Sequence, residues 1–238
     1  MPLERGKQCD DEFLGKKPPE ETVADIYMYA DETGNWDMSG SVGASGYFGF
    51  GTAVVAREHG TEMWAGFKLR CDLERRGVSL PRGLHAKDDS HATRDEMFHL
   101  IGRQRPRVDV TFLCKANAHP SVRERPHWLY KLAWLSHFKN TIEQVSTPGD
   151  TVYVIAATLT TNRRIMNARA ALAEVCERYV TDRHVVLCVW DAPSAWGIQV
   201  ADYCLWAVQR HREGRACKWY ESQVEPNLGS FSTPWGKL

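Results

Sequence analysis

Asp25–Thr33 and the two residues after it read Asp-Ile-Tyr-Met-Tyr-Ala-Asp-Glu-Thr-Gly-Asn, and this stretch decides the fold. Apolar and aromatic side chains run without a break from Ile26 to Ala30, which is typical of a strand covered on both faces. The strand ends in two carboxylates, Asp31 and Glu32, followed by turn residues. An ionised group at the rim of a core is costly unless it is paired or binds a metal. Two interpretations therefore stay open: the acids open a hairpin turn, or they belong to a metal site.

The rest of the chain predicts an α/β fold. Tyr47–Val55 is expected to pair back on the first strand as a hairpin, and β-branched runs predict further strands at 108–114, 151–157 and 184–190. Apolar residues at helical spacing predict helices at 61–76, from about 93, and at 121–145, 163–180 and 195–212, with a short extended piece at 84–89. Because hairpin strands come first and strands then alternate with helices, we expect a mixed central sheet flanked by helices.

Three regions are expected along the 238 residues. Residues 1–22 lack the apolar segment of a secretion signal and predict a flexible N-terminal arm. Residues 23–212 are long enough to form one domain with its own core. Residues 213–238 are expected to form an irregular C-terminal tail packed on that domain.

Composition restricts the class of function. Thirty basic residues balance thirty acidic ones, so the chain lacks the overall basic footprint of a dedicated nucleic-acid binder, although an enzyme with a local basic rim fits. The seven cysteines include no Cys-x-x-Cys pair, which argues against a zinc ribbon and favours a reducing compartment. No apolar run is long enough to span a membrane. We therefore expect a cytoplasmic protein that does not contact a membrane.

A second acid lies in an equally apolar setting far downstream. The segment from Asp191 to Trp206 predicts a helix that is apolar on most sides, with Gln199 and Asp202 embedded near its start. An unpaired Asp there would be costly, so Asp202 needs a hydrogen-bonded partner or a cation. Gln199 and Asp202 could instead cap a neighbouring loop, and the sequence leaves both interpretations open.

Two carboxylates from distant parts of the chain can share a hard cation. Mg²⁺ takes oxygen ligands and commonly uses only one or two protein carboxylates among its waters. Without a metal, two such acids packed together would repel, and one would hold a proton. With a metal they can align a water against a phosphodiester. Asp31 and Asp202 are therefore our candidate ligands for Mg²⁺ or Mn²⁺.

Three short motifs, in this order, resemble the bacterial and phage family called domain of unknown function 3800. They are Tyr-Ala-Asp31-Glu32-Thr-Gly34-Asn, Leu-His85-Ala86-Lys87 and the helix Ser194…Gln199-Val-Ala-Asp202. The resemblance runs from about Ile26 to about Trp206 and implies a ribonuclease H-like fold. It also implies Asp31 as the central metal ligand, Asp202 as the ligand from the last helix, His85 lining the site and Gln199 orienting it.

The sequence departs from that pattern in one place. Such folds commonly offer a further acid after a middle strand, and residues 154–158 supply none. Asp191, Asp88 or Asp89 could substitute for it. Otherwise the site holds a single ion, or the fold has been kept without the activity.

The expected function is a metal-dependent nuclease acting on RNA or DNA. Asp31, Glu32, His85 and Asp202 are the candidate catalytic residues, supported by Ser194, Gln199, Lys87 and Asp191. The alternative is a catalytically inactive ribonuclease H-like protein that binds its partner through the same cleft, for example in phage–host interaction.

Other signals are weaker. Trp128, Trp134, Trp190 and Trp206 recur at helical or strand spacing, which predicts positions in the core more than base-stacking platforms. Arg94 and His99 fit the spacing of a motif of metal-independent ribonucleases, but a motif this short arises readily by chance.

Overall fold

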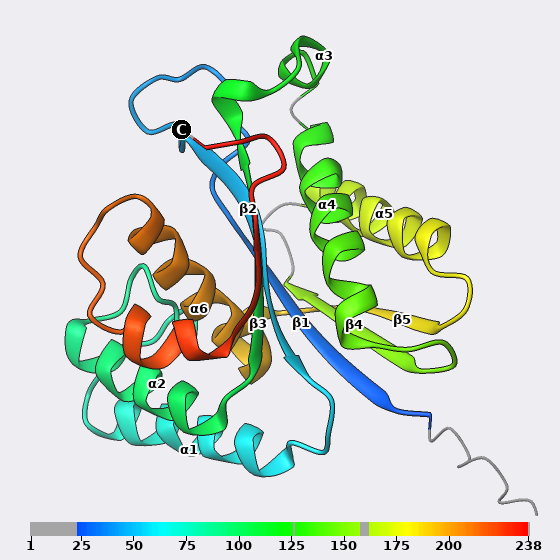
Figure 1. The fold of residues 1–238 in the computed structure, drawn as a ribbon. Coiled ribbons are helices and arrows are strands. Elements are labelled where there is room, and N and C mark those ends of the chain that lie inside the picture. Colours follow the sequence, from blue (N-terminus) through cyan, green and yellow to red (C-terminus); the bar gives the residue numbers. More distant parts are fainter. Residues whose placement is uncertain (1–22, 126, 158–161, 238) are drawn as a thin grey trace, which may run out of the picture.

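The computed structural model describes residues 23–125, 127–157 and 162–237 (Figure 1). A six-stranded mixed sheet in the order β5-β4-β1-β2-β3-β6 forms its centre. The arm predicted for residues 1–22 lies outside the described residues.

The first three strands form an antiparallel meander. β1 (Asp25–Thr33) pairs with β2 (Tyr47–Val55), and β2 pairs with β3 (Arg107–Cys114). On the other side, β4 (Thr151–Ala157) runs parallel to β1, and β5 (His184–Trp190) runs parallel to β4. The hairpin followed by strands that alternate with helices confirms the predicted α/β fold class with a mixed central sheet.

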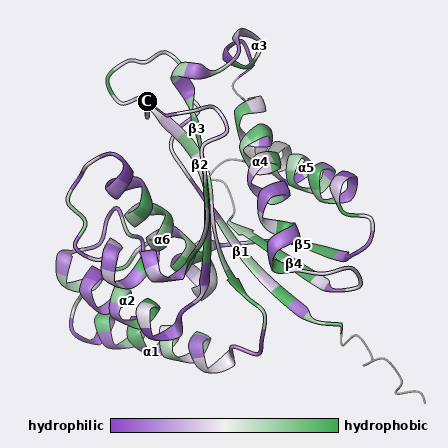
Figure 2. Cartoon of the chain, in the orientation of Figure 1, coloured by the Kyte–Doolittle hydropathy of each residue, from purple (hydrophilic) through white to green (hydrophobic). Residues whose placement is uncertain are grey.

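Helices cover both faces of the sheet (Figure 1). α1 (Gly60–Arg75), α2 (His91–Gln104) and α6 (Trp196–Arg212) lie on one face, and α4 (His127–Val145) and α5 (Asn162–Tyr179) lie on the other. Figure 2 shows hydrophobic residues along the strands and hydrophilic residues on the outer turns of α1 and α2. The helix predicted at 121–145 is two helices, α3 (Pro120–Arg123) and α4.

The alternation of β1 decides which of its acids meets which helix. Ile26, Met28 and Ala30 belong to the core on the α4 side. Tyr29 belongs to a separate cluster with Ile198 of α6. Because successive strand residues point to opposite faces, Asp31 lies on the α6 side and Glu32 on the α4 side.

Two local predictions were wrong. Residues 84–89 form a turn instead of an extended piece, because the Asp89 carboxylate accepts the backbone N–H of His85 at 2.8 Å. The end of the chain is not irregular: it contains a π-helical turn (Tyr220–Val224) and β6 (Leu228–Ser232), which pairs in parallel with β3 and extends the sheet.

The predicted core tryptophans divide into two groups. Trp134 is completely buried. Trp128 and Trp190 are 39% and 44% exposed, so the prediction was wrong for them. Both lie near an end of their element, where periodicity continues although the neighbouring layer does not cover the side chain.

The described cysteines, Cys71 to Cys217, are all free. In the described ranges, no helix has both the length and the apolar character needed to cross a membrane.

Candidate functional site

A pocket of about 670 Å³ lies where the carboxyl end of β1 meets α6. Five of the predicted site residues line it: Asp31, Glu32, His85, Lys87 and Asp202. The remaining wall includes basic and aromatic residues that the predictions did not include, among them His91, Arg94, Trp206, Arg210 and Trp219.

Two glycines let α6 approach β1 closely. A Cβ on Gly197 would lie 2.2 Å from the ring of Tyr29, and a Cβ on Gly51 would lie 2.8 Å from Leu205. Gly51 is the cross-strand partner of Asp31. Asp202 lies between Gly197 and Leu205 on α6, so this close packing brings its carboxylate to the pocket that Asp31 lines.

Asp31 carries the strongest sign of electrostatic strain in the pocket. Burial raises the pKa of its carboxyl well above the usual value, and the neighbouring carboxylates of Glu32 and Asp202 raise it further. Within the described part of the chain, neither Asp31 nor Asp202 forms an ion pair with a lysine or arginine. A bound cation would relieve this repulsion.

Glu32 borders the same pocket from the other face of the strand. Burial raises the pKa of its carboxyl to about 7, and the Asp202 carboxylate adds to the rise. On the α4 side, the charges of Glu32 and Asp31 add to the burial that raises the pKa of Tyr130. Glu32 therefore flanks the pair Asp31 and Asp202 and does not face it directly.

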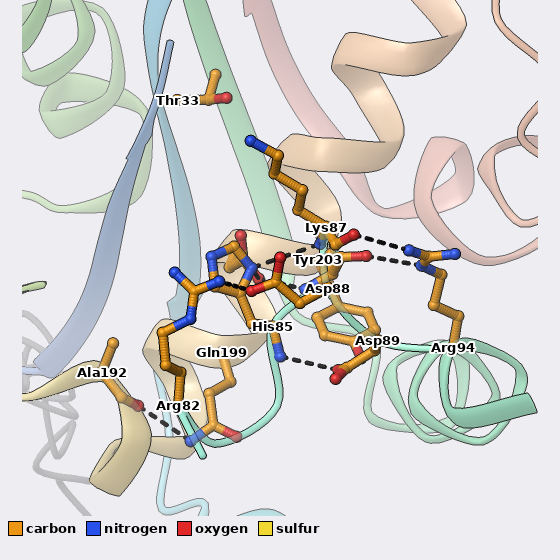
Figure 3. Close-up of polar contacts among 12 residues, drawn as sticks. Thr33, Arg82, His85, Lys87, Asp88, Asp89, Arg94, Ala192, Gln199 and Tyr203 are labelled. Atoms are coloured by element: carbon orange, nitrogen blue, oxygen red, sulfur yellow. Dashed lines mark hydrogen bonds and ion pairs between the residues drawn. The ribbon is translucent and has the colours of Figure 1, made fainter. Parts of the chain in front are cut away.

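Asp202 also holds the turn that carries His85. Its Oδ2 accepts the backbone N–H of Ala86 at 2.7 Å and lies 3.4 Å from Nδ1 of His85. Asp89 fixes the same turn to α6, because it accepts the N–H of His85 and the hydroxyl of Tyr203 (Figure 3). The two interpretations left open for Asp202 are thus compatible: it caps a loop with one oxygen and borders the acidic pocket.

The carboxylates that this pocket offers to a metal are enough for one hard cation. Across the ranges that the structure describes, no group of three or more His, Cys, Asp or Glu side chains is placed to hold a metal. Two carboxylates remain, Asp31 and Asp202, and this is within the number that Mg²⁺ takes from a protein when water completes its shell. A site of two ions would require further acids.

The candidate replacements for the missing acid lie outside the pocket that Asp31 and Asp202 line. Asp88 pairs with Arg82, and Asp89 binds the His85 turn (Figure 3). Asp191 is exposed at the end of β5, and its carbonyl accepts the hydroxyl of Ser194 at 2.9 Å. None of the three is among the described residues that line the acidic pocket.

No protein-family profile matches the chain, and no curated protein matches its sequence. Among solved structures, the crystal structure of the ribonuclease H2 from Pyrococcus horikoshii OT3 is similar, with 16% sequence identity and a TM-score of 0.40. The match covers 79% of this chain and 73% of that chain. This similarity is too distant to assign a function.

Gln199 and Ser194 line a different surface, so the supporting roles predicted for them at the acids need correction. The amide of Gln199 donates to the carbonyls of Ala192 and Pro193, both at 3.0 Å, and holds the turn before α6. Figure 3 shows Gln199 and Ala192 well away from Thr33, which ends β1. Both residues border an apolar groove beside Trp64 and other residues of α1.

A buried lysine holds the loop that forms another part of the wall around Asp31 and Asp202. Lys115 donates from Nζ to the carbonyl of Asn35 at 3.0 Å and to that of Asp37 at 2.6 Å. Burial lowers the pKa of Lys115. This ammonium fixes the loop directly after β1, and Asn35 lines the pocket from there.

Sequence reasoning missed several residues of the pocket wall, among them Arg94, Trp206 and Arg210. Arg94 was noted only within a short ribonuclease-like motif, and Trp206 was expected in the core. A usable signal was present, since Asp202, Trp206 and Arg210 follow each other at steps of four and therefore share one face of a helix.

Proposed function

We propose that this protein is a metal-dependent nuclease that hydrolyses phosphodiesters of nucleic acid, with Asp31 and Asp202 as ligands of Mg²⁺ or Mn²⁺. Membership of the domain of unknown function 3800 family and a cytoplasmic location are parts of the same proposal. The observation that supports it most is the meeting of two carboxylates in one pocket without a described lysine or arginine to neutralise either. Such an arrangement is costly unless a cation binds there.

The pocket residues have separable tasks in this proposal. Asp31 and Asp202 hold the ion, which would polarise a phosphodiester and offset the charge that develops on it. Nδ1 of His85 lies against Asp202, so Nε2 is the atom that can take or return a proton. Lys87 lies on the same turn and can contact a phosphate oxygen through its ammonium.

One observation favours the alternative, an inactive protein that binds nucleic acid through this pocket. The described residues supply two metal-ligating carboxylates and no third, whereas a two-ion mechanism needs more. Metal binding separates the two proposals. Mg²⁺ or Mn²⁺ should raise the melting temperature of the wild type but not of Asp202→Ala, because a ligand of the folded state stabilises that state by mass action.

The direct test is cleavage of labelled single-stranded and duplex RNA and DNA with and without Mn²⁺. Asp31→Asn should abolish cleavage and keep the fold, as judged by circular dichroism. Glu177→Gln is the matched control, since Glu177 is exposed on α5 and is not part of the pocket. Wild-type rates in Asp31→Asn would refute the assignment.

A further inference from the structure

The pocket has a second, cationic part, which begins beside the turn that carries His85. Arg94 of α2 and Arg210 of α6 both lie over the indole of Trp206, with guanidinium carbons 4.8 and 5.0 Å from the ring centroid. All three residues line the pocket. Stacking on an aromatic ring fixes the plane of a guanidinium group and leaves its edges available for hydrogen bonds.

The two arginines are held in place, but their charge is not neutralised. Arg94 donates from Nε and Nη2 to the carbonyls of Ala86 and Lys87, at 2.6 and 3.1 Å. Arg210 donates from Nε and Nη2 to the carbonyl of Ala216, at 3.2 and 3.0 Å. Every acceptor is a neutral carbonyl, and no carboxylate of the described chain pairs with either arginine. One terminal nitrogen of each, Nη1, has no hydrogen-bond partner among the described residues.

The acid that directly follows α6 is occupied by other partners. Glu213 lines the pocket, pairs with Arg215 at 2.5 Å and accepts the amide of Gln209 at 2.7 Å. The pair of Arg94 and Arg210 therefore remains a site of positive charge within the pocket. Guanidinium groups with free N–H edges are well suited to phosphate.

Asp202 and Arg210 occupy well-separated positions along α6. Asp202 and Arg210 are eight residues apart on one helix face, which corresponds to about 12 Å along the axis. The two backbone positions are therefore far enough apart to serve two different phosphates. Successive phosphates of one nucleic-acid strand advance by about 3.4 Å per nucleotide along a duplex axis, so a strand that follows α6 would place different phosphates at the two positions.

We propose that Arg94 and Arg210 form a phosphate subsite for a nucleic-acid strand, and that it binds a phosphate other than the one beside Asp31 and Asp202. This rests on the proposed function for the ligand class. The spacing of Asp202 and Arg210 along α6 favours a strand over a nucleoside polyphosphate, whose linked phosphates lie closer together. Trp206 then orients the two guanidinium groups and is a positioning residue.

Binding can be tested apart from cleavage. The probe is a fluorescent single-stranded oligonucleotide of about ten nucleotides, titrated by anisotropy at several salt concentrations in the Asp31→Asn background without metal. Adding Arg210→Gln should weaken binding about tenfold and lower the slope of log K against log salt by about one. Arg210→Lys, which keeps the charge, should recover most of the slope. The matched control is Arg75→Gln, since Arg75 is an exposed arginine of α1 outside the pocket.

The outcomes are decisive in each direction. Equal binding by Arg210→Gln and Arg75→Gln, or no oligonucleotide binding at all, would overturn the subsite. Displacement of the oligonucleotide by ATP at equal concentration would overturn the choice of a strand and indicate a polyphosphate ligand. Binding that depends on Arg210, in a protein whose wild type cleaves no nucleic acid, would keep the subsite and reject the nuclease.

Discussion

Glu32→Gln offers a quantitative test of the electrostatics around the acids. In the wild type the pKa of Glu32 rises from 4.5 to about 7, chiefly because the carboxyl is buried. At about 1.4 kcal/mol per pH unit, this corresponds to about 3 kcal/mol. Between pH 4.5 and 7 the folded state binds more protons than the unfolded state, so the free energy of unfolding falls as pH rises. Above pH 7 the whole cost of ionising Glu32 is present.

The variant should lack that cost. At pH 8 without metal, Glu32→Gln should exceed the wild type in free energy of unfolding by up to about 3 kcal/mol, and at pH 4.5 the two should nearly agree. Urea unfolding at both pH values measures this, with Glu177→Gln as an exposed control. A difference that is the same at pH 4.5 and pH 8 would refute the reasoning. Asp31 adds to the difference in the same direction, because loss of the Glu32 charge also relieves the rise in the pKa of Asp31. Titrating groups away from the pocket cancel in the comparison.

Three further predictions concern the supports of the pocket and the core. Gly51→Ala should destabilise the protein by about 1–3 kcal/mol and weaken metal binding, because the new Cβ would meet Leu205 and push α6 away from β1; urea unfolding and Mn²⁺ titration check both effects. Asp89→Ala should cost about 1–3 kcal/mol in the same unfolding assay and lower the cleavage rate, since it frees the turn that carries His85. The pKa of His137 falls to about 4 because the ring is buried, so stability should be lost as pH falls from 6.5 to 4, and NMR should find this imidazole still neutral at pH 5.5.

The first two predictions have matched control variants, and the third has an outcome that would refute it. Gly60→Ala adds the same methyl group where nothing lies within 4 Å, so stability should not fall there. Asp72→Ala removes an exposed carboxylate of α1 and should leave the pocket intact. An imidazole of His137 that protonates near pH 6.5 would show that its bonds to Thr52 and Thr111 do not exclude the charged form.

The elements that make the sheet were predictable because their side-chain periods are unambiguous. β1 and α6 are long segments with unbroken apolar stretches, and the acids that follow or interrupt these stretches include Asp31 and Asp202. β6 was missed because Leu228–Ser232 contains a glycine and two serines, and it becomes a strand by pairing with the edge of β3. Local propensity does not report such an edge.

The pocket was only partly predictable for a related reason. Helical spacing places Gln199 and Asp202 near one another on α6, but it does not reveal that the carbonyls of Ala192 and Pro193 bind the amide of Gln199. Likewise the meeting of Arg94 with Trp206 depends on how α2 packs beside α6. Contacts of this kind are set by tertiary structure, which periodicity within one segment does not contain.

The central claim is that Asp31 and Asp202 together bind one divalent ion. Electron paramagnetic resonance of free Mn²⁺ during a protein titration measures this most directly. We predict one Mn²⁺ per wild-type chain, little or no binding by Asp31→Asn and by Asp202→Asn, and wild-type binding by Glu177→Gln. Undiminished Mn²⁺ binding by either Asp variant would contradict the claim, as would its absence in the wild type.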